Sequence, residues 1–407
     1  MKSEIFHSST FKLLSKRGIS VISANQFLRV FSRSQLWIFL PLYLYLQRNV
    51  PYMTIGILFF LMSVLSLPFT LYAGRFIDRN GPKKTIIISN ASLSAILIML
   101  FFTVVYNSNL YYLYFILICT EPFMNIIGSA DNVIVSQYSS SSQRTAAFSV
   151  VRIFQNAGFS LGSAIGGFVA LLSYSYVFLI IAVSSIIELI IYILYLEETK
   201  ITGVNQNRNI QAKFYAAFRN RNFFMISILI ALSFVIMGQW GTTLTLFWRG
   251  YDSMTTIQVG MLYSVNGIVV TLGQIPTNRL IAGLSDIARI NLGYLLYLFS
   301  FSILPFFTGF SFLVVDTIII TLGENIITPS INSVISRASP PEARGQYFTS
   351  FQALTGLVAP SAPVLGTFLL TVFSSNMGMM WYPLTIIGTI FFIAFIPIWK
   401  KIKLYED

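Results

Sequence analysis

Residues 74–84 read GRFIDRNGPKK, a charged stretch between two long apolar runs. The run before it is PYMTIGILFFLMSVLSLPFTLYA, and the run after it is TIIISNASLSAILIMLFFTVV. An apolar run of about 20 residues is long enough to cross the hydrocarbon core of a bilayer as a helix. The charged stretch, with five charges in eleven residues, is therefore predicted to connect two membrane-spanning helices at the membrane surface.

The whole chain has the composition of a membrane protein. Hydrophobic residues make up 55% of it and charged residues only 10%, whereas soluble domains carry about 25% charged residues. Lipid offers the backbone no hydrogen-bonding partner, so long, continuously apolar runs must be helices. We predict an all-α integral membrane protein with twelve transmembrane helices, near 18–47, 52–74, 84–106, 110–137, 145–172, 175–196, 222–248, 256–278, 287–308, 310–336, 345–373 and 378–399.

A single long polar connection divides these spans into two sets of six. We predict an N-terminal half at 1–197, a cytoplasmic linker at 198–221 and a C-terminal half at 222–407. With the N-terminus inside, the cytoplasmic segments hold 21 Lys and Arg residues, and the outer loops hold only Arg48 and Arg249. Because cytoplasmic loops are rich in Lys and Arg, both termini are expected in the cytoplasm and the protein in the cytoplasmic membrane.

Composition and missing motifs exclude several function classes. The net charge of +12 is explained by contact with the anionic inner leaflet, and no nucleic-acid partner is expected. One cysteine, Cys119, and one histidine, His7, argue against an internal disulfide or a metal site. No removable signal peptide, nucleotide-binding loop or nucleophile motif is recognisable. We expect no enzyme and no cofactor, but a monomer whose partners are a small-molecule substrate, protons and membrane lipids.

The two predicted halves contain matching residues. Adding 204 to the residue number in the early spans, or 200 in the later ones, places identical residue types on each other. The matches include Gly56 with Gly260, Gln35 with Gln239, Arg75 with Arg279, Asn125 with Asn325, Asn132 with Asn332, Arg144 with Arg344 and Gly166 with Gly366. We infer a duplicated six-helix unit, an arrangement that in secondary transporters builds a central site opening to alternate sides.

The 74–84 stretch resembles the signature loop between spans 2 and 3 of the major facilitator superfamily, G-x-L-A-D-R-x-G-R-K. Its pattern positions are occupied by Gly74, Asp78, Arg79, Gly81 and Lys83, whereas Phe76 and Pro82 depart from the pattern. The resemblance implies a two-half transporter fold and assigns Asp78 to a latch that breaks when the halves move. Glycine permits the tight turn that such a connection needs. Alternatively, the basic residues only fix the topology.

A second stretch, GFSLGSAIGG at 158–167, resembles the G-x-x-x-G-P-x-x-G-G pattern in span 5 of the drug:proton antiporter branch of that superfamily. Gly158, Gly162, Gly166 and Gly167 fit the pattern, and Ser163 stands at its proline position. Glycines four apart form a smooth face that a neighbouring helix approaches closely, and we expect this face at the contact between the halves. Met124 replaces an arginine that this branch carries in span 4.

Polar and charged residues inside the spans are expensive in lipid and mark candidate functional positions. Asn25, Arg29 and Arg33 follow at i, i+4 and i+8, which places them on one helical face. The resemblance implies that spans 1, 4, 7 and 10 line a central cavity. The candidate residues of a substrate and proton cavity are Asn25, Arg29, Arg33, Glu121, Asn125, Gln239 and Glu324. Asp131 and Arg152 are interpreted as a structural pair, and Glu188 and Asp316 receive no role.

A buried carboxyl group is a candidate proton carrier because burial and a nearby arginine shift its pKa in opposite directions. We expect Arg29 or Arg33 to lie opposite Glu324, either as part of coupling or as a static ion pair. The sequence thus predicts a secondary transporter that exports a small organic molecule in exchange for protons. One alternative is transport of an organic anion held by Arg29 and Arg33. Another is a membrane sensor that binds without transporting.

Overall fold

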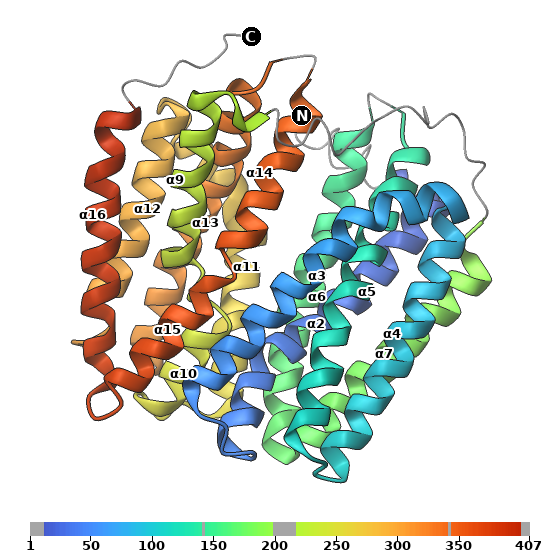
Figure 1. Cartoon of the computed structure of the whole chain (residues 1–407), viewed down its shortest axis with the longest axis horizontal. Helices are drawn as coiled ribbons and strands as arrows, with labels where there is room; N and C mark the ends of the chain where they lie inside the picture. Colours follow the sequence, from blue (N-terminus) through green and yellow to red (C-terminus); the bar gives the residue numbers. More distant parts are fainter. Residues whose placement is uncertain (1–11, 141–142, 198–216, 341–342, 400–407) are drawn as a thin grey trace. The chain divides into compact units, whose positions relative to one another are not determined.

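The computed structural model describes residues 12–140, 143–197, 217–340 and 343–399, and within these ranges all regular structure is helical (Figure 1). The all-α prediction is thereby confirmed. The chain divides into two compact units. We call residues 1–43 with 61–204 the N-terminal unit, and residues 44–60 with 205–407 the C-terminal unit. Most of the predicted linker at 198–221 lies outside the described residues.

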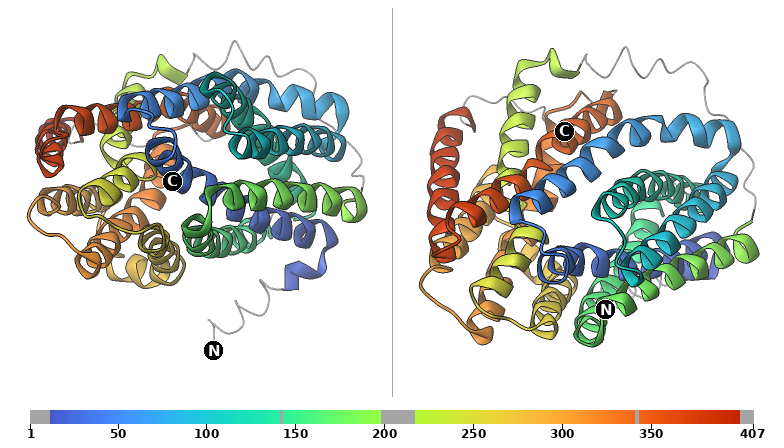
Figure 2. Two further views of the ribbon diagram at one scale, coloured as in Figure 1. Left: turned by 90° about the horizontal axis from the view of Figure 1, so that it is seen from below. Right: turned by 60° about the horizontal axis from the view of Figure 1, so that its bottom comes forward.

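Six long helices follow one another in the N-terminal part of the chain. They are α2 (Arg17–Leu46), α3 (Tyr52–Asn80), α4 (Pro82–Val105), α5 (Leu110–Gln137), α6 (Arg144–Leu172) and α7 (Tyr174–Tyr195). A short 3₁₀ helix, η1 (Lys12–Ser15), precedes them. Side-chain caps start two of them, since Asn109 accepts a hydrogen bond at the start of α5 and Ser173 does so at the start of α7. Within the N-terminal unit, α4 packs along both α5 and α7 (Figures 1 and 2).

The C-terminal unit has more and shorter helices. They are α9 (Arg221–Met237), α10 (Thr242–Gly250), α11 (Thr256–Leu280), α12 (Asp286–Ile303), α13 (Phe310–Arg337), α14 (Arg344–Val358), α15 (Ser361–Val372), η3 (Met377–Met380) and α16 (Trp381–Trp399). The longest, α13, packs against α11 and α12. A capping box of Thr255 and Gln258 starts α11.

Two spans that the sequence predicts as continuous are broken in the C-terminal unit. The span predicted at 222–248 consists of α9 and α10, and the span at 345–373 consists of α14 and α15. The first break ends at Gly241, whose φ of 79° lies in the region that favours glycine. The second break lies at Ala359 and Pro360, and proline cannot donate a helical backbone hydrogen bond. Their repeat counterparts, α2 and α6, are continuous.

By length and composition, nine helical segments of the described chain can cross a membrane. The three remaining predicted spans, 18–47, 145–172 and 287–308, correspond to α2, α6 and α12. Arginines within α2, together with Asn25 and Gln35, lower the mean hydropathy of that helix below the value expected of a membrane span. The expected number of twelve crossings is therefore not confirmed, whereas a multi-pass helical membrane protein is.

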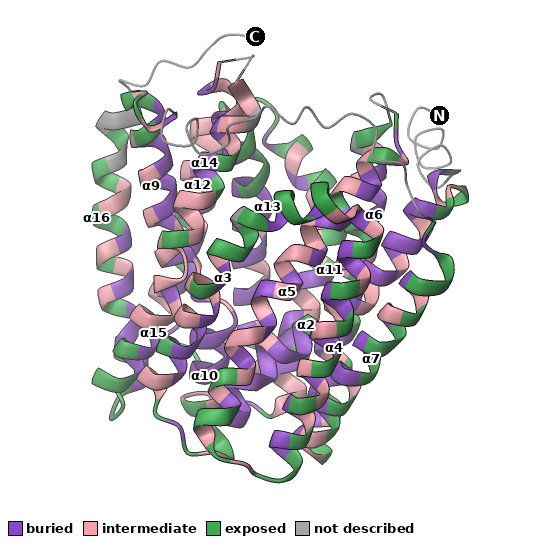
Figure 3. Cartoon of the chain, turned by 45° about the vertical axis from the view of Figure 1, so that its right-hand side comes forward, coloured by how far each residue is buried: buried purple, intermediate pink, exposed green. Residues whose placement is uncertain are grey.

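Burial on α7 is the reverse of that on a surface helix of a soluble protein, and both exposed and buried residues lie along this helix (Figure 3). On α7, Ile186 and Ile190 are exposed while Ser184, Glu188 and Tyr192 are buried. An exposed apolar face is stable in lipid, because lipid tails are as apolar as isoleucine and burying that side chain brings no hydrophobic gain. This pattern turns the polar face of α7 toward the interior of the unit.

The glycine face of α6 packs against α2 of the same unit. A Cβ atom at Gly158 would meet the backbone of Phe27, and one at Gly162 would meet the backbone of Phe31. Gly166 lies against Gln35, and Gly167 beside it is buried. The expected position of these glycines between the halves is therefore corrected, because their close neighbour is the first long helix of their own unit.

The C-terminal unit repeats one of these contacts. A Cβ atom at Gly366 of α15 would meet the side chains of Gln239 and Thr243. Gln35 and Gln239 are repeat-related, as are Gly166 and Gly366. The same glutamine-to-glycine contact thus occurs once in each unit, which supports the inferred duplication.

Candidate functional site

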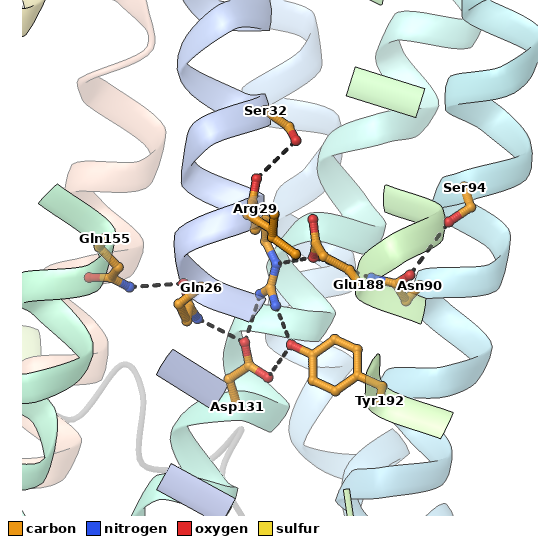
Figure 4. Close-up of polar contacts among 10 residues, drawn as sticks. Gln26, Arg29, Ser32, Asn90, Ser94, Asp131, Gln155, Glu188 and Tyr192 are labelled. Carbon is orange, nitrogen blue, oxygen red and sulfur yellow. Dashed lines mark hydrogen bonds and ion pairs between the residues drawn. The ribbon is translucent and has the colours of Figure 1, made fainter. Parts of the chain in front are cut away.

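Arg29 of α2 is the centre of a buried polar cluster in the N-terminal unit (Figure 4). Its Nη1 lies 2.7 Å from Oδ2 of Asp131, and its Nε lies 3.2 Å from Oε2 of Glu188. Its Nη2 donates a hydrogen bond to the hydroxyl of Tyr192. The three charged side chains are only 7%, 1% and 3% exposed. We call this set, Arg29, Asp131, Glu188 and Tyr192, the Arg29 cluster.

Amides and a hydroxyl complete the hydrogen bonding of the cluster. Tyr192 donates to Oδ1 of Asp131 over 2.9 Å, and Gln26 donates to Oδ2 of Asp131 over 2.8 Å. Gln155 of α6 donates in turn to Gln26 over 3.0 Å. Asn90 of α4 donates to Oε2 of Glu188 over 3.5 Å. The polar contacts therefore join α2, α4, α5, α6 and α7 (Figure 4).

The charges of the cluster do not balance. One guanidinium group faces two carboxyl groups, so the ionised cluster carries one negative charge in excess. An uncompensated charge that is buried and surrounded by a membrane is strongly unfavourable. Uptake of one proton would remove this excess charge. Chemically, the cluster is suited to bind and release a proton.

The structure corrects two sequence-based interpretations. Asp131 was expected to pair with Arg152, but its ion pair is with Arg29, and Arg152 is exposed. Glu188 was given no role, yet it contacts Arg29. A signal for Glu188 existed in the sequence. In this largely apolar helix, polar residues recur every four positions at Ser184, Glu188 and Tyr192, and so share one face.

The second arginine of α2 is also paired within its unit. Arg33 Nη2 lies 3.0 Å from Oε2 of Glu121 on α5, and the two side chains are 48% and 18% exposed. Both arginines therefore have carboxylate partners within the N-terminal unit. The expectation that one of them lies opposite Glu324 stays a prediction. In the C-terminal unit, Asn266 donates to Glu324 over 3.3 Å and to Thr321 over 2.9 Å.

The other predicted cavity residues have separate environments. Asn125 donates to Ser66 over 3.1 Å. Gln239, at the break between α9 and α10, donates to the carbonyl of Val235 over 2.7 Å, while its own oxygen has no partner among the described residues. Asn25 is fully buried, and its amide forms no hydrogen bond within the described part of the chain. Among the described residues, no hydrogen bond links Asn25, Asn125 or Gln239 to the Arg29 cluster.

The charged 74–84 stretch is more helical than predicted. Gly74, Asp78 and Arg79 belong to the end of α3, and Lys83 belongs to the first turn of α4. Only Gly81 separates the two helices, and its φ of 80° explains why glycine is needed there. Asp78 is exposed and forms no ion pair with another described residue. Its assignment to a latch stays a prediction.

Comparison with known proteins establishes the family. Residues 22–363 match the model of the Major Facilitator Superfamily. The chain belongs to this superfamily. Across the described residues, no group of three or more His, Cys, Asp or Glu side chains is arranged to hold a metal ion.

Two relatives and two solved structures illustrate the similarity. The MFS-type transporter YttB of Bacillus subtilis is 24% identical over 81% of this chain and 83% of its own length. The class B tetracycline resistance protein of Escherichia coli is 22% identical over 80% of each chain. The nucleoside transporter NupG has a TM-score of 0.78 at 14% identity, covering 94% of this chain and 99% of its own. A POT family transporter in complex with 5-aminolevulinic acid has a TM-score of 0.76 at 13% identity, covering 95% and 97%. The two structures show the shared fold alone.

Proposed function

We propose that this secondary transporter exports a small organic molecule in exchange for protons, by alternating access. The observation that carries the proposal is the charge excess of the Arg29 cluster, in which two buried carboxyl groups share one guanidinium group. A site of this kind binds a proton more readily than an exposed carboxylate does, because protonation removes a buried charge. Proton binding and release at such a site is the step that a proton-driven exporter requires.

Export is favoured over uptake by two resemblances. The span 5 pattern of Gly158, Gly162, Gly166 and Gly167 resembles that of the drug:proton antiporter branch. The first three of these glycines allow α6 to pack closely against the helix that carries Arg29. In addition, one relative is a tetracycline resistance protein. The candidate substrate cavity keeps the predicted residues Asn25, Arg33, Glu121, Asn125, Gln239 and Glu324, with Asp78 as the proposed latch.

Transport of an organic anion is the alternative within this class. It requires Arg29 and Arg33 to hold the anion, as guanidinium groups do for carboxylates and phosphates. Both arginines already have carboxylate partners, at 2.7 Å and 3.0 Å. An anion would have to displace these carboxylates, which counts against this alternative. A membrane sensor with a transporter fold is the alternative outside the class.

Flux across reconstituted vesicles tests the proposal. The purified protein is inserted into liposomes with an imposed pH gradient, and uptake of amphipathic cations, sugars and organic acids is compared with empty liposomes. We expect an amphipathic compound to accumulate in the compartment from which protons leave, and dissipation of the gradient to abolish this accumulation. Binding without flux would favour the sensor. Flux that ignores the pH gradient would contradict proton coupling.

A further inference from the structure

We propose that Glu188 of α7 carries the coupling proton, while Asp131 stays ionised as the permanent partner of Arg29. This inference rests on the proposed proton-coupled function and names the residue within the Arg29 cluster that performs it. The argument comes from the unequal hydrogen bonding of the two carboxyl groups.

Asp131 has the environment of a carboxylate. Its Oδ2 lies 2.7 Å from Nη1 of Arg29 in an ion pair and accepts a hydrogen bond from Gln26 at 2.8 Å. Its Oδ1 accepts from Tyr192 at 2.9 Å. Three short donors on both oxygens stabilise the ionised form, and a protonated carboxyl group would lose at least one of them. Asp131 is therefore the poorer proton acceptor of the pair.

Glu188 has fewer and longer contacts. Both of its donors, Arg29 Nε at 3.2 Å and Asn90 Nδ2 at 3.5 Å, point to the same oxygen, Oε2. The second oxygen, Oε1, accepts no hydrogen bond from the residues that the structure describes. A proton on Oε1 would leave the contact between Oε2 and Arg29 in place. The step is balanced simply: Glu188 gains a proton from water on one side of the membrane and returns it to water on the other.

Within the described part of the chain, Arg29 is the only group that forms an ion pair with Glu188. Glu188 is faced by Arg29 from α2 and by Asp131 from α5, and Tyr192 is the titratable neighbour on its own helix. The helices α4 and α6 pack against α7, but their basic residues form no ion pair with Glu188. These basic residues are Lys83, Lys84, Arg144 and Arg152. The hydrogen bond that the carboxyl group accepts from α4 comes from the neutral amide of Asn90.

Tyr192 is a positioning residue in this scheme. It lies four residues after Glu188 and on the same face of α7. Its hydroxyl accepts from Arg29 and donates to Asp131, and so holds the guanidinium group against Asp131. The contact between Arg29 and Glu188, at 3.2 Å, is therefore longer than that between Arg29 and Asp131, at 2.7 Å.

Infrared spectroscopy tests the inference without a substrate. The full chain in lipid, carrying Asp252→Asn and Asp316→Asn so that these two carboxyl groups do not contribute, is titrated across pH, and the C=O stretch of the remaining buried protonated carboxyl group is followed. Exchanging Asp for Glu changes the frequency of this band, because the frequency depends on the side chain that bears the group. We expect Glu188→Asp to shift the band, Glu188→Gln to remove it, and Asp131→Glu and Glu324→Gln to leave its frequency unchanged. A shift with Asp131→Glu, or loss with Glu324→Gln, would overturn the inference.

Vesicle flux separates this inference from the proposed function. If the wild-type chain shows no flux driven by a pH gradient, the proposed function fails whatever the spectra show. If wild-type flux is driven by the gradient, we expect Glu188→Gln to abolish gradient-driven accumulation while substrate exchange persists, and Glu188→Asp to restore part of the accumulation. Full coupling in Glu188→Gln would overturn the role of Glu188 and leave the proposed function intact.

Discussion

Five residues in and around the Arg29 cluster have repeat counterparts in the C-terminal unit, and all five counterparts line one small cavity there. Adding 204 in the early spans and 200 in the later ones pairs Gln26 with Ile230, Arg29 with Ser233, Asn90 with Tyr294, Asp131 with Ile331 and Tyr192 with Phe392. Glu188 corresponds to Gly388, where an added Cβ atom would lie 3.3 Å from the hydroxyl of Tyr294. The same place in the repeated unit is therefore charged in one half and mostly apolar in the other.

This difference shows that the two units share the packing of their repeated helices but differ in the side chains at this position. The packing of the repeated helices is similar enough that equivalent positions still converge on one place. The side chains there have diverged, and without carboxyl groups at Ile331 and Gly388 the C-terminal cavity has no counterpart of the excess charge. We therefore expect proton coupling at this position to reside in the N-terminal unit alone.

The largest effect is expected for Arg29→Met. Removing the guanidinium group leaves Asp131 and Glu188 buried without a cation, which should lower the free energy of unfolding by about 3–5 kcal/mol. The matched change in the other unit is Ser233→Ala, whose hydroxyl bonds only to the carbonyl of Leu229, and it should change stability by less than about 1 kcal/mol. Thermal unfolding in lipid nanodiscs measures both.

A triple variant, Arg29→Met with Asp131→Asn and Glu188→Gln, sharpens this test. It makes the cluster neutral, as its C-terminal counterpart is, and should recover most of the stability that Arg29→Met loses. If Arg29→Met alone is as stable as the wild type, the carboxyl groups do not depend on Arg29, and the charge comparison between the units fails.

Glycine packing provides the next largest effect. Gly162→Ala places a methyl group against the backbone of Phe31, and overpacking of this kind should destabilise the protein by about 1–3 kcal/mol. The control is Gly128→Ala on α5, where an added Cβ atom has nothing within 4 Å. Unfolding temperatures of the two variants give the comparison. Equal tolerance of both substitutions would mean that α6 and α2 are not held in close contact.

Asp252 lies in the connection between α10 and α11 and is expected to make the stability of the protein depend on pH. Its repeat-related residue in the N-terminal half of the sequence is Arg48. Burial, with a smaller contribution from nearby Asp316, raises the pKa of Asp252 to about 7, although the backbone of Gly309 opposes the shift. A raised carboxyl pKa favours the folded state at low pH, so stability should fall as pH rises from about 4 to about 7. The expected loss is about 1–2 kcal/mol after allowance for partial exposure. Asp252→Asn should remove this dependence in unfolding measured across pH, and an unchanged profile would contradict it.

A smaller contrast concerns the ends of α3 and α12. Asp286 accepts a hydrogen bond from Ser333 over 2.6 Å and lies 3.4 Å from Arg337, whereas exposed Asp78 forms no ion pair within the described residues. Asp286→Asn should lower the free energy of unfolding by about 1 kcal/mol. Asp78→Asn should leave stability unchanged and, if the latch proposal holds, slow transport. Normal flux in Asp78→Asn at normal expression would remove the latch role.

The sequence predicted the architecture better than the site. Apolar runs of sufficient length specify helices, and the positions of Gly74, Asp78 and Gly81 indicated the family. The duplication was also predictable, because Gln35 and Gly166 recur in the other half. The partners of Arg29 were not, because which faces of α5 and α7 turn toward α2 depends on tertiary packing. Periodicity could have placed Glu188 on a polar face with Ser184 and Tyr192, although the sequence analysis gave it no role, and periodicity gives no indication of the residue opposite it.

The smallest expected effect is that of Tyr294→Phe in the C-terminal cavity. The Tyr294 hydroxyl is buried and has no hydrogen-bond partner among the described residues. Removing an unsatisfied buried hydroxyl should leave stability unchanged or raise it by up to about 1 kcal/mol. Tyr192→Phe removes a tyrosine hydroxyl from the charged side of the comparison, where it bonds to both Arg29 and Asp131, and should cost about 1–3 kcal/mol. Unfolding temperatures of the two variants decide between two descriptions of the cavity. A clear loss of stability in Tyr294→Phe would mean that the cavity holds a water molecule bonded to this hydroxyl, and that the two units differ in charge but not in polarity.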